Sequence, residues 1–201
     1  GGFALLSVLG GALGTITPIR RMVGRGAPGR RPQCGSEQEA HRHVLAPPHR
    51  TAAPVGLGRD ALDALGPGGA VRVDANGAWD VYTAVAAVRA LDRAAGGLEY
   101  VEQPCRTIDE LAAVRRRVDV RIAADESIRR AGDPLRVAVA GAADVAVLKC
   151  APLGGVARAL QVAQAAGLPC VVSSALETSV GLAAEVALAA ALPELGFACG
   201  L

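Results

Sequence analysis

Five polar residues recur at a nearly constant interval, each at the end of a short apolar run. They are Asp74, Glu102, Asp125, Lys149 and Ser173, and the gaps between them are 28, 23, 24 and 24 residues. An interval of this length suits one strand followed by one helix, so the sequence repeats a β/α module. In a (β/α) barrel the carboxyl ends of the strands converge on one face. We therefore expect these five side chains to share a site.

The three acidic members of this set are candidate metal ligands. Three carboxylates that converge on one point repel each other unless a cation lies between them. A hard divalent cation with a preference for oxygen ligands would remove that repulsion. The sequence therefore predicts Mg²⁺, with Mn²⁺ as the alternative, held by Asp74, Glu102 and Asp125. The competing interpretation is that each acid only caps the helix that follows it.

Lys149 is the only lysine of the chain, and the other 20 of its 21 basic residues are arginines. It follows the apolar run Val145 to Leu148, which predicts that its ammonium group is partly desolvated. Desolvation and a neighbouring metal ion would both lower its pKa toward the range of a proton-transfer group. The alternative is a lysine whose ammonium group simply reaches solvent from a strand end.

Alternating strands and helices must position these residues. Apolar runs predict strands within residues 70–76, 98–104, 120–127, 144–150 and 168–175. Caps predict helices after Asp80, after the capping box Thr107 to Glu110, and after Asp133, where Pro134 follows and Gly141 ends the helix. Two further helices should run from about residue 156 to Gly167 and from about 179 to before Pro193. The fold class is α/β, with a closed or nearly closed ring of strands.

The composition bounds the remaining possibilities. With 201 residues, 51% of them hydrophobic, and a net charge of +2, the chain suits one globular domain without a nucleic-acid surface. Five scattered cysteines favour a reducing cytoplasm over a disulfide framework. The apolar residues 1–19 lack a basic leader, so we expect no signal or membrane segment. Residues 1–56 are expected to be irregular, because residues 20–56 are rich in Arg, Pro and Gly and their histidines lack metal spacing.

The polar strand ends also carry a family resemblance. "VDAN" with Asp74, "VEQP" with Glu102 and "ADES" with Asp125 resemble the metal-ligand motifs of the muconate-lactonizing subgroup of the enolase superfamily. "LKCAPLGG" resembles the strand that carries its second active-site lysine, and "SSALETSVGL" is most similar to the actinobacterial o-succinylbenzoate synthase family. The resemblance covers residues 57–201, which we expect to form the barrel domain.

The resemblance implies a (β/α) barrel with a capping domain, and a lyase that abstracts an α-proton and eliminates water in menaquinone biosynthesis. The substrate would be a small-molecule carboxylate. Lys149 would then be catalytic, and Ser173 and Ser174 would bind the succinyl end of the substrate. Asn76, Gln103 and Glu126 would support the metal ligands, although roles in helix capping or loop packing are equally open.

The sequence departs from the family before residue 57. The other catalytic lysine of the family belongs to a Lys-x-Lys motif on the strand preceding "VRVDAN", and no lysine occurs there. Six of eight barrel units can be traced, with the first two missing and the last, at "FACGL", incomplete. We hypothesise a truncated gene or a change of reading frame that impairs the activity. The alternatives are an N-acylamino acid racemase or dipeptide epimerase, and a catalytically inactive fragment.

Overall fold

A parallel sheet forms the inner layer of the protein. The computed structural model describes residues 2–9, 12–20 and 70–201. Within 70–201 each strand pairs in parallel with the next, so the chain adds strands in sequence order. The strands are β3 (Ala70–Asp74), β4 (Leu98–Glu102), β5 (Ile122–Ala124), β6 (Val145–Leu148) and β7 (Cys170–Val172). All five lie within the predicted ranges, which confirms the α/β class.

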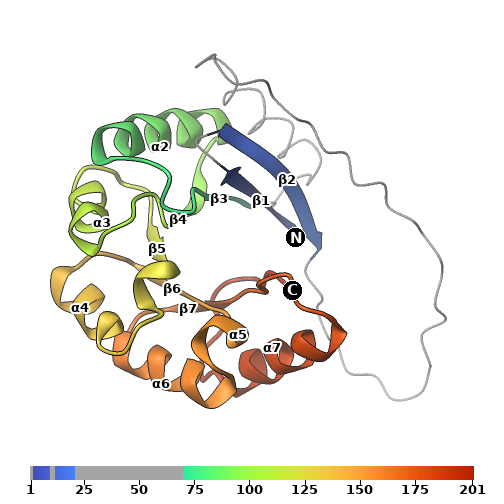
Figure 1. Cartoon of the computed structure of the whole chain (residues 1–201). Helices are drawn as coiled ribbons and strands as arrows, with labels where there is room; N and C mark the ends of the chain where they lie inside the picture. Colours follow the sequence, from blue (N-terminus) through green and yellow to red (C-terminus); the bar gives the residue numbers. More distant parts are fainter. Residues whose placement is uncertain (1, 10–11, 21–69) are drawn as a thin grey trace.

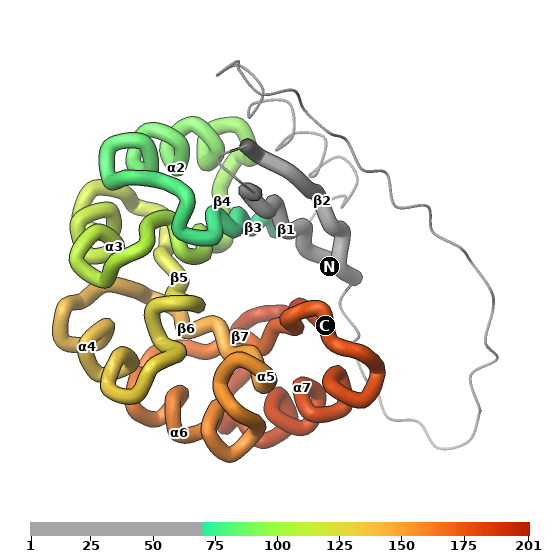
Figure 2. The backbone as a smooth tube through the Cα atoms, viewed as in Figure 1, coloured from blue at the N-terminus to red at the C-terminus, as the bar shows by residue number. Residues whose placement is uncertain are grey.

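Helices cover the outer side of this sheet. Figure 1 shows the strands curving along the inside of an arc of helices, and Figure 2 follows the chain around the same arc from α2 to α7. The arrangement is a partial (β/α) barrel, as predicted. The helices are α2 (Val81–Ala95), α3 (Ile108–Arg115), η1 (Glu126–Ile128), α4 (Asp133–Ala140), α5 (Cys150–Leu153), α6 (Val156–Ala166) and α7 (Ser179–Ala191).

The helix boundaries follow the capping residues of the sequence. The Asp80 carboxylate accepts the Thr83 N–H at 2.7 Å at the start of α2. Thr107 and Glu110 form the predicted capping box of α3, in which each side chain accepts the backbone N–H of the other. The prediction for α4 is wrong by one residue. Gly132 is the N-cap, with φ of 87°, and Asp133 is already helical, because only the glycine adopts the left-handed turn without strain.

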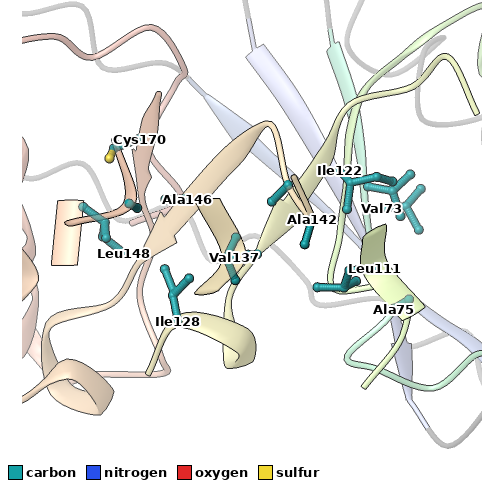
Figure 3. Close-up of a cluster of buried hydrophobic side chains, with 14 of the residues drawn as sticks. Val73, Ala75, Leu111, Ile122, Ile128, Val137, Ala142, Ala146, Leu148 and Cys170 are labelled. Atoms are coloured by element: carbon teal, nitrogen blue, oxygen red, sulfur yellow. The ribbon is translucent and has the colours of Figure 1, made fainter. Parts of the chain in front are cut away.

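The apolar core lies on both faces of the sheet. The larger cluster fills the space between the strands and the helices, where Val73, Ile122, Leu148 and Cys170 meet Leu111 and Val137 (Figure 3). A smaller cluster lines the concave face and comprises Tyr100, Ala123, Val145, Val147 and Val171, with Phe197 packed against it. Successive strand residues point to opposite faces. The polar residues at the strand ends therefore point to the concave face, like the residues two positions before them.

The two ends of the chain also reach the sheet. At the C-terminal end, "FACGL" reaches the sheet through one isolated parallel bridge, between Ser173 and Gly200 beside β7. That it begins another strand stays a prediction. The structure also has β1 (Gly2–Leu9) and β2 (Ala12–Arg20) where we expected an irregular segment. β1 pairs in parallel with β3 and antiparallel with β2. These segments are rich in the apolar and β-branched residues that favour strands.

The predicted division of the chain at residue 57 lies outside the described residues. So do the three histidines, Cys34, and the segment of about residues 34–50 in which we sought the Lys-x-Lys motif. The domain division therefore stays a prediction. Among the residues that the structure describes, no helix is long and apolar enough to cross a membrane.

Candidate active site

The carboxyl end of the sheet gathers the predicted site residues. Asp74 and Glu102 are the last residues of β3 and β4, while Asp125, Lys149 and Ser173 directly follow β5, β6 and β7. By strand alternation, Glu102 shares the concave face with Tyr100, and Lys149 shares it with Val147. The side chains of Asp74, Glu102 and Asp125 are buried. The spacing in the sequence therefore places these five residues at the same edge of the sheet.

Lys149 joins two of the carboxylates directly. Its Nζ donates to Asp125 Oδ2 at 2.6 Å and to Glu102 Oε1 at 3.2 Å. Only 12% of the Lys149 side chain is exposed, compared with 3% of each carboxylate side chain. Charge-assisted hydrogen bonds of this kind are stronger in a buried setting than on a surface. Lys149 is thus an integral member of a buried charge cluster rather than a lysine that reaches into solvent.

The carboxylates hold more negative charge than the cluster neutralises. Burial raises the pKa of Asp74 to about 6, although the hydrogen bond from the Asn76 N–H and the charge of Lys149 oppose the rise. Burial, together with the charges of Asp74 and Asp125, raises the pKa of Glu102 to about 8. Raised carboxyl pKa values mean that the site favours added positive charge, whether a proton or a cation.

The acids of the cluster act on the Lys149 pKa against the predicted lowering. Burial of the ammonium group lowers its pKa, but the negative charges of Glu102 and Asp125 outweigh burial and raise it above its ordinary value. At neutral pH Lys149 is therefore an ammonium group. The predicted lowering by a neighbouring metal ion stays a prediction.

Two of the predicted supporting residues hold the carboxylates in place. The Asn76 N–H donates to Asp74 Oδ1 at 2.9 Å. Gln103 is buried, and its Oε1 accepts the N–H groups of Asp125 and Ser127 at 3.1 and 3.3 Å. Its Nε2 donates to Ser127 Oγ at 2.7 Å and to the Cys105 carbonyl at 2.8 Å. Gln103 therefore fixes the turn that carries Asp125.

The predicted substrate-binding serines lie at the rim of the same edge. The Ser173 Oγ donates to the Gly200 carbonyl at 3.4 Å, and the Ser174 N–H donates to the same carbonyl at 2.8 Å. Both serines are half-buried. These hydrogen bonds join both serines to the adjacent bridge, and their role toward a substrate stays a prediction.

Arg129 is a member of the charge cluster that the sequence analysis missed. Its Nη2 donates to both carboxylate oxygens of Asp125 at 2.8 Å, and its Nε donates to Oδ1 at 3.1 Å. The same Nη2 lies 3.3 Å from Glu126 Oε1, so the predicted supporting residue Glu126 contacts this arginine. The i,i+4 spacing of Asp125 and Arg129 was the available signal. The 3₁₀ turn η1 brings the pair together.

Glu185 is a second residue that the sequence analysis missed. It is fully buried in α7, and its Oε1 accepts the N–H of Cys150 at 2.7 Å. Cys150 follows Lys149 directly, so this bond ties the lysine-bearing turn to a helix 35 residues away. A single acid within the apolar helix "SVGLAAEVALAAA" was the signal for a buried carboxylate with a backbone partner.

The donor types suit a hard divalent cation, but they are not arranged as a finished cage. Carboxylate oxygens are the ligands that Mg²⁺ prefers, and two of the three acids have raised pKa values. Within residues 70–201, no three Asp, Glu, His or Cys side chains form a group around a common metal position. Lys149 instead joins Glu102 to Asp125.

Comparison with curated proteins identifies close sequence relatives. The chain is 73% identical over 139 residues to the o-succinylbenzoate synthase of Thermobifida fusca. The matched region covers 69% of this chain and 43% of that protein. It is 66% identical over 131 residues to the o-succinylbenzoate synthase of Mycolicibacterium smegmatis, covering 65% of this chain and 40% of the relative. The chain thus spans less than half the length of these relatives.

Solved structures extend the comparison to the wider superfamily. The L-Ala-D/L-Glu epimerase from Bacillus subtilis superposes with a TM-score of 0.64 at 31% identity, over 73% of this chain and 42% of the epimerase. The muconate lactonizing enzyme from Pseudomonas putida superposes with a TM-score of 0.61 at 32% identity, over 73% of this chain and 42% of that enzyme. An enolase from Thermobispora bispora, complexed with magnesium and formate, superposes with a TM-score of 0.64 at 29% identity. The superposition covers 73% of this chain and 36% of that enolase.

A sequence model of one family spans most of the chain. The model of the enolase C-terminal domain-like family matches residues 39–201, which include every strand end of the site. The resemblance of "VDAN", "VEQP" and "ADES" is thereby confirmed at the level of the superfamily. The chain belongs to the enolase C-terminal domain-like family of the enolase superfamily.

Proposed function

We propose that this chain is the barrel part of an o-succinylbenzoate synthase-like lyase, which eliminates water from a cyclohexadiene carboxylate in menaquinone biosynthesis. The observation that carries the proposal is Lys149, which bridges Glu102 and Asp125 at the carboxyl ends of consecutive strands. Identity of 73% to a protein named o-succinylbenzoate synthase supports this reaction over others on the same scaffold.

Asp74, Glu102 and Asp125 are the residues that would hold Mg²⁺, with Mn²⁺ as the alternative. The bound cation would neutralise the substrate carboxylate and so make its α-proton more acidic. Burial, together with the neighbouring acids, raises the pKa of Asp74 and Glu102, and a cation at this position would offset both effects. Asn76 and Gln103 would keep the carboxylates oriented through the hydrogen bonds of the Asn76 N–H and the Gln103 side chain.

Lys149 would place its ammonium group beside the anionic reacting end of the substrate. As an ammonium group it can stabilise negative charge or donate a proton, but it cannot accept one. The family's other catalytic lysine, in the Lys-x-Lys motif, would be the base, and no lysine besides Lys149 occurs in this sequence. Because loss of a general base typically costs about 10²- to 10⁴-fold, we propose that turnover is reduced by about this factor relative to the relatives. Ser173 and Ser174 would bind the succinyl end.

The first experiment measures formation of o-succinylbenzoate from its cyclohexadiene precursor with millimolar Mg²⁺. Wild-type protein is compared with Lys149→Ala, and with Arg136→Gln as a control for a surface charge. Slow turnover that disappears in Lys149→Ala and persists in Arg136→Gln supports the lyase. If no product forms from folded wild-type protein while the Thermobifida fusca relative converts the same substrate, the catalytically inactive fragment is the correct alternative.

A second candidate activity is racemisation or epimerisation at the same site. The structural match to an L-Ala-D/L-Glu epimerase favours it, because both reactions begin with removal of a proton next to a carboxylate. Incubation of N-acylamino acids and dipeptides in D₂O separates the two activities. Exchange of the α-proton without any dehydration product would support the racemase or epimerase.

We also propose that the protein is cytoplasmic. Its ligands would be a small-molecule carboxylate and the metal ion. Cys105, Cys150, Cys170 and Cys199 are free cysteines in the part of the chain that the structure describes. Free thiols are typical of reducing compartments. Mass spectrometry of alkylated thiols in lysate would test this, since extensive oxidation in the native host would contradict it.

A further inference from the structure

All hydrogen-bonding positions of the Asp125 carboxylate are occupied. Oδ1 accepts from Nε and Nη2 of Arg129 at 3.1 and 2.8 Å. Oδ2 accepts from Arg129 Nη2 at 2.8 Å and from Lys149 Nζ at 2.6 Å. A carboxylate offers about four lone-pair sites, two on each oxygen. A divalent cation can therefore bind Asp125 only if one of these two side chains releases it.

The surroundings of Lys149 and Arg129 decide which of these two side chains releases Asp125. Lys149 is enclosed, with 12% of its side chain exposed. Its second acceptor, Glu102, has only 3% of its side chain exposed. Arg129 has 33% of its side chain exposed, so its guanidinium can move with little desolvation cost. Its Nη2 already lies 3.3 Å from Glu126 Oε1, and the Glu126 side chain is 41% exposed. Arg129 thus has an alternative acceptor, Glu126, which directly follows Asp125 in the sequence and is in contact with solvent.

We propose that Arg129 is an internal competitor of the metal ion, which holds Asp125 when no cation is bound and moves to Glu126 when one binds. The inference rests on the proposed metal site. It gives Arg129 and Glu126 a specific role in cation affinity. It also gives a physical reason why no three acids form a finished cage among residues 70–201.

The charges of the cluster agree with this exchange. Asp74, Glu102, Asp125 and Glu126 contribute four negative charges when ionised, and Lys149 and Arg129 contribute two positive ones. A divalent cation added to this set balances its charge. Because Glu126 already lies 3.3 Å from Arg129, the arginine keeps a negative partner when the cation takes its place at Asp125. The exchange therefore leaves neither a carboxylate of the site nor the arginine unpaired.

Calorimetric titration of the full chain with Mg²⁺ tests the exchange without measuring activity. The variants are Arg129→Gln, Glu126→Gln and the double variant, and Arg130→Gln is the matched control for loss of one exposed positive charge on the neighbouring residue. Since breaking a charge-assisted fork releases Asp125, we expect Arg129→Gln to tighten Mg²⁺ binding about tenfold. Glu126→Gln should weaken binding several-fold in the wild-type background, and Arg130→Gln should change it less than about twofold.

The double variant separates exchange from simple electrostatics. If Glu126 acts by receiving Arg129, its replacement has no effect once Arg129 is glutamine. Equal weakening by Glu126→Gln in both backgrounds, or weaker Mg²⁺ binding in Arg129→Gln, would overturn the exchange while leaving the metal site intact. If neither the wild type nor any variant binds Mg²⁺, although circular dichroism shows that all are folded, the metal site and the exchange both fail. Mg²⁺ binding by Arg129→Gln alone would support the exchange.

Discussion

Replacing Lys149 by methionine should destabilise the metal-free protein more than any change at a surface charge. Methionine has a similar length and keeps the contacts of the lysine stem, but it removes the ammonium group. Glu102 and Asp125 would lose the donor at 3.2 and 2.6 Å while remaining buried, with 3% of each side chain exposed. Removal of one partner from a buried ion pair typically costs 3–5 kcal/mol. We expect about 3 kcal/mol, because Arg129 still holds Asp125.

The destabilisation caused by Lys149→Met should depend on pH, because the pKa of Glu102 determines its direction. Burial and nearby acids already raise the pKa of Glu102 to about 8, and removal of Lys149 would raise it further. Below about pH 8 Glu102 is neutral in both proteins and is not an unpaired buried charge. The cost of Lys149→Met should therefore grow as the pH rises through about 8 and should shrink toward pH 5.

Urea denaturation in EDTA, followed by circular dichroism and by fluorescence of the single tryptophan, Trp79, measures this difference. Trp79 packs against the main core cluster, so its emission reports global unfolding. Arg136→Gln is the control, since the exposed pair with Asp133 is worth less than about 0.5 kcal/mol. A Lys149→Met protein as stable as the wild type at pH 8, or one whose deficit grows on acidification, would refute the buried ion cluster.

Three further predictions concern the elements that support the site. Thr107→Ala should lower the free energy of unfolding by about 1 kcal/mol through loss of the capping box of α3, and an unchanged urea midpoint would contradict that role. Gln103→Leu should destabilise the protein by about 2 kcal/mol and speed hydrogen exchange at the Asp125 and Ser127 amides, which would lose their acceptor. In EDTA, the stability of the wild type should fall as the pH rises from about 4 to about 8. Asp74 and Glu102 have folded-state pKa values of about 6 and about 8, above the ordinary 3.8 and 4.5, so the folded state binds more protons over this range. A stability that rises with pH in denaturation curves would show that these carboxyls are not desolvated.

The features predicted from the sequence are those determined by short segments. Apolar runs located all five parallel strands of residues 70–201, and capping residues located the starts of α2, α3 and α4 to within about a residue, whereas η1 and the short α5 were not predicted. The constant spacing brought Glu102, Asp125 and Lys149 to one edge of the sheet. The functional roles of these residues remain predictions, because geometry alone does not show a bound metal ion or substrate.

The missed features depend on contacts that no short segment determines. Arg129 reaches Asp125 because η1 winds the chain into a tight turn after β5, and the sign of the Lys149 pKa shift depends on that same crowding of charges. Glu185 acquires its role only when α7 packs beside the turn at Cys150. The strands β1 and β2 replace the expected irregular segment because their pairing with each other and with β3 depends on contacts that their own residues do not determine.

Arg72 gives the arc a property that a simple row of β/α units would lack. Its buried side chain starts on β3, lies over the Tyr100 ring at 4.8 Å, donates from Nε to Glu99 at 2.6 Å, and donates from Nη1 to the Ala198 carbonyl at 2.8 Å. That last bond joins residues 126 positions apart, and Phe197 adds an edge-on contact with Tyr100. Solenoid repeats can unfold one at a time because each contacts only its neighbours. Here the first strand of residues 70–201, β3, and the segment of residues 197–200 share contacts, so the arc should unfold as a single cooperative unit, with both losing their protection together.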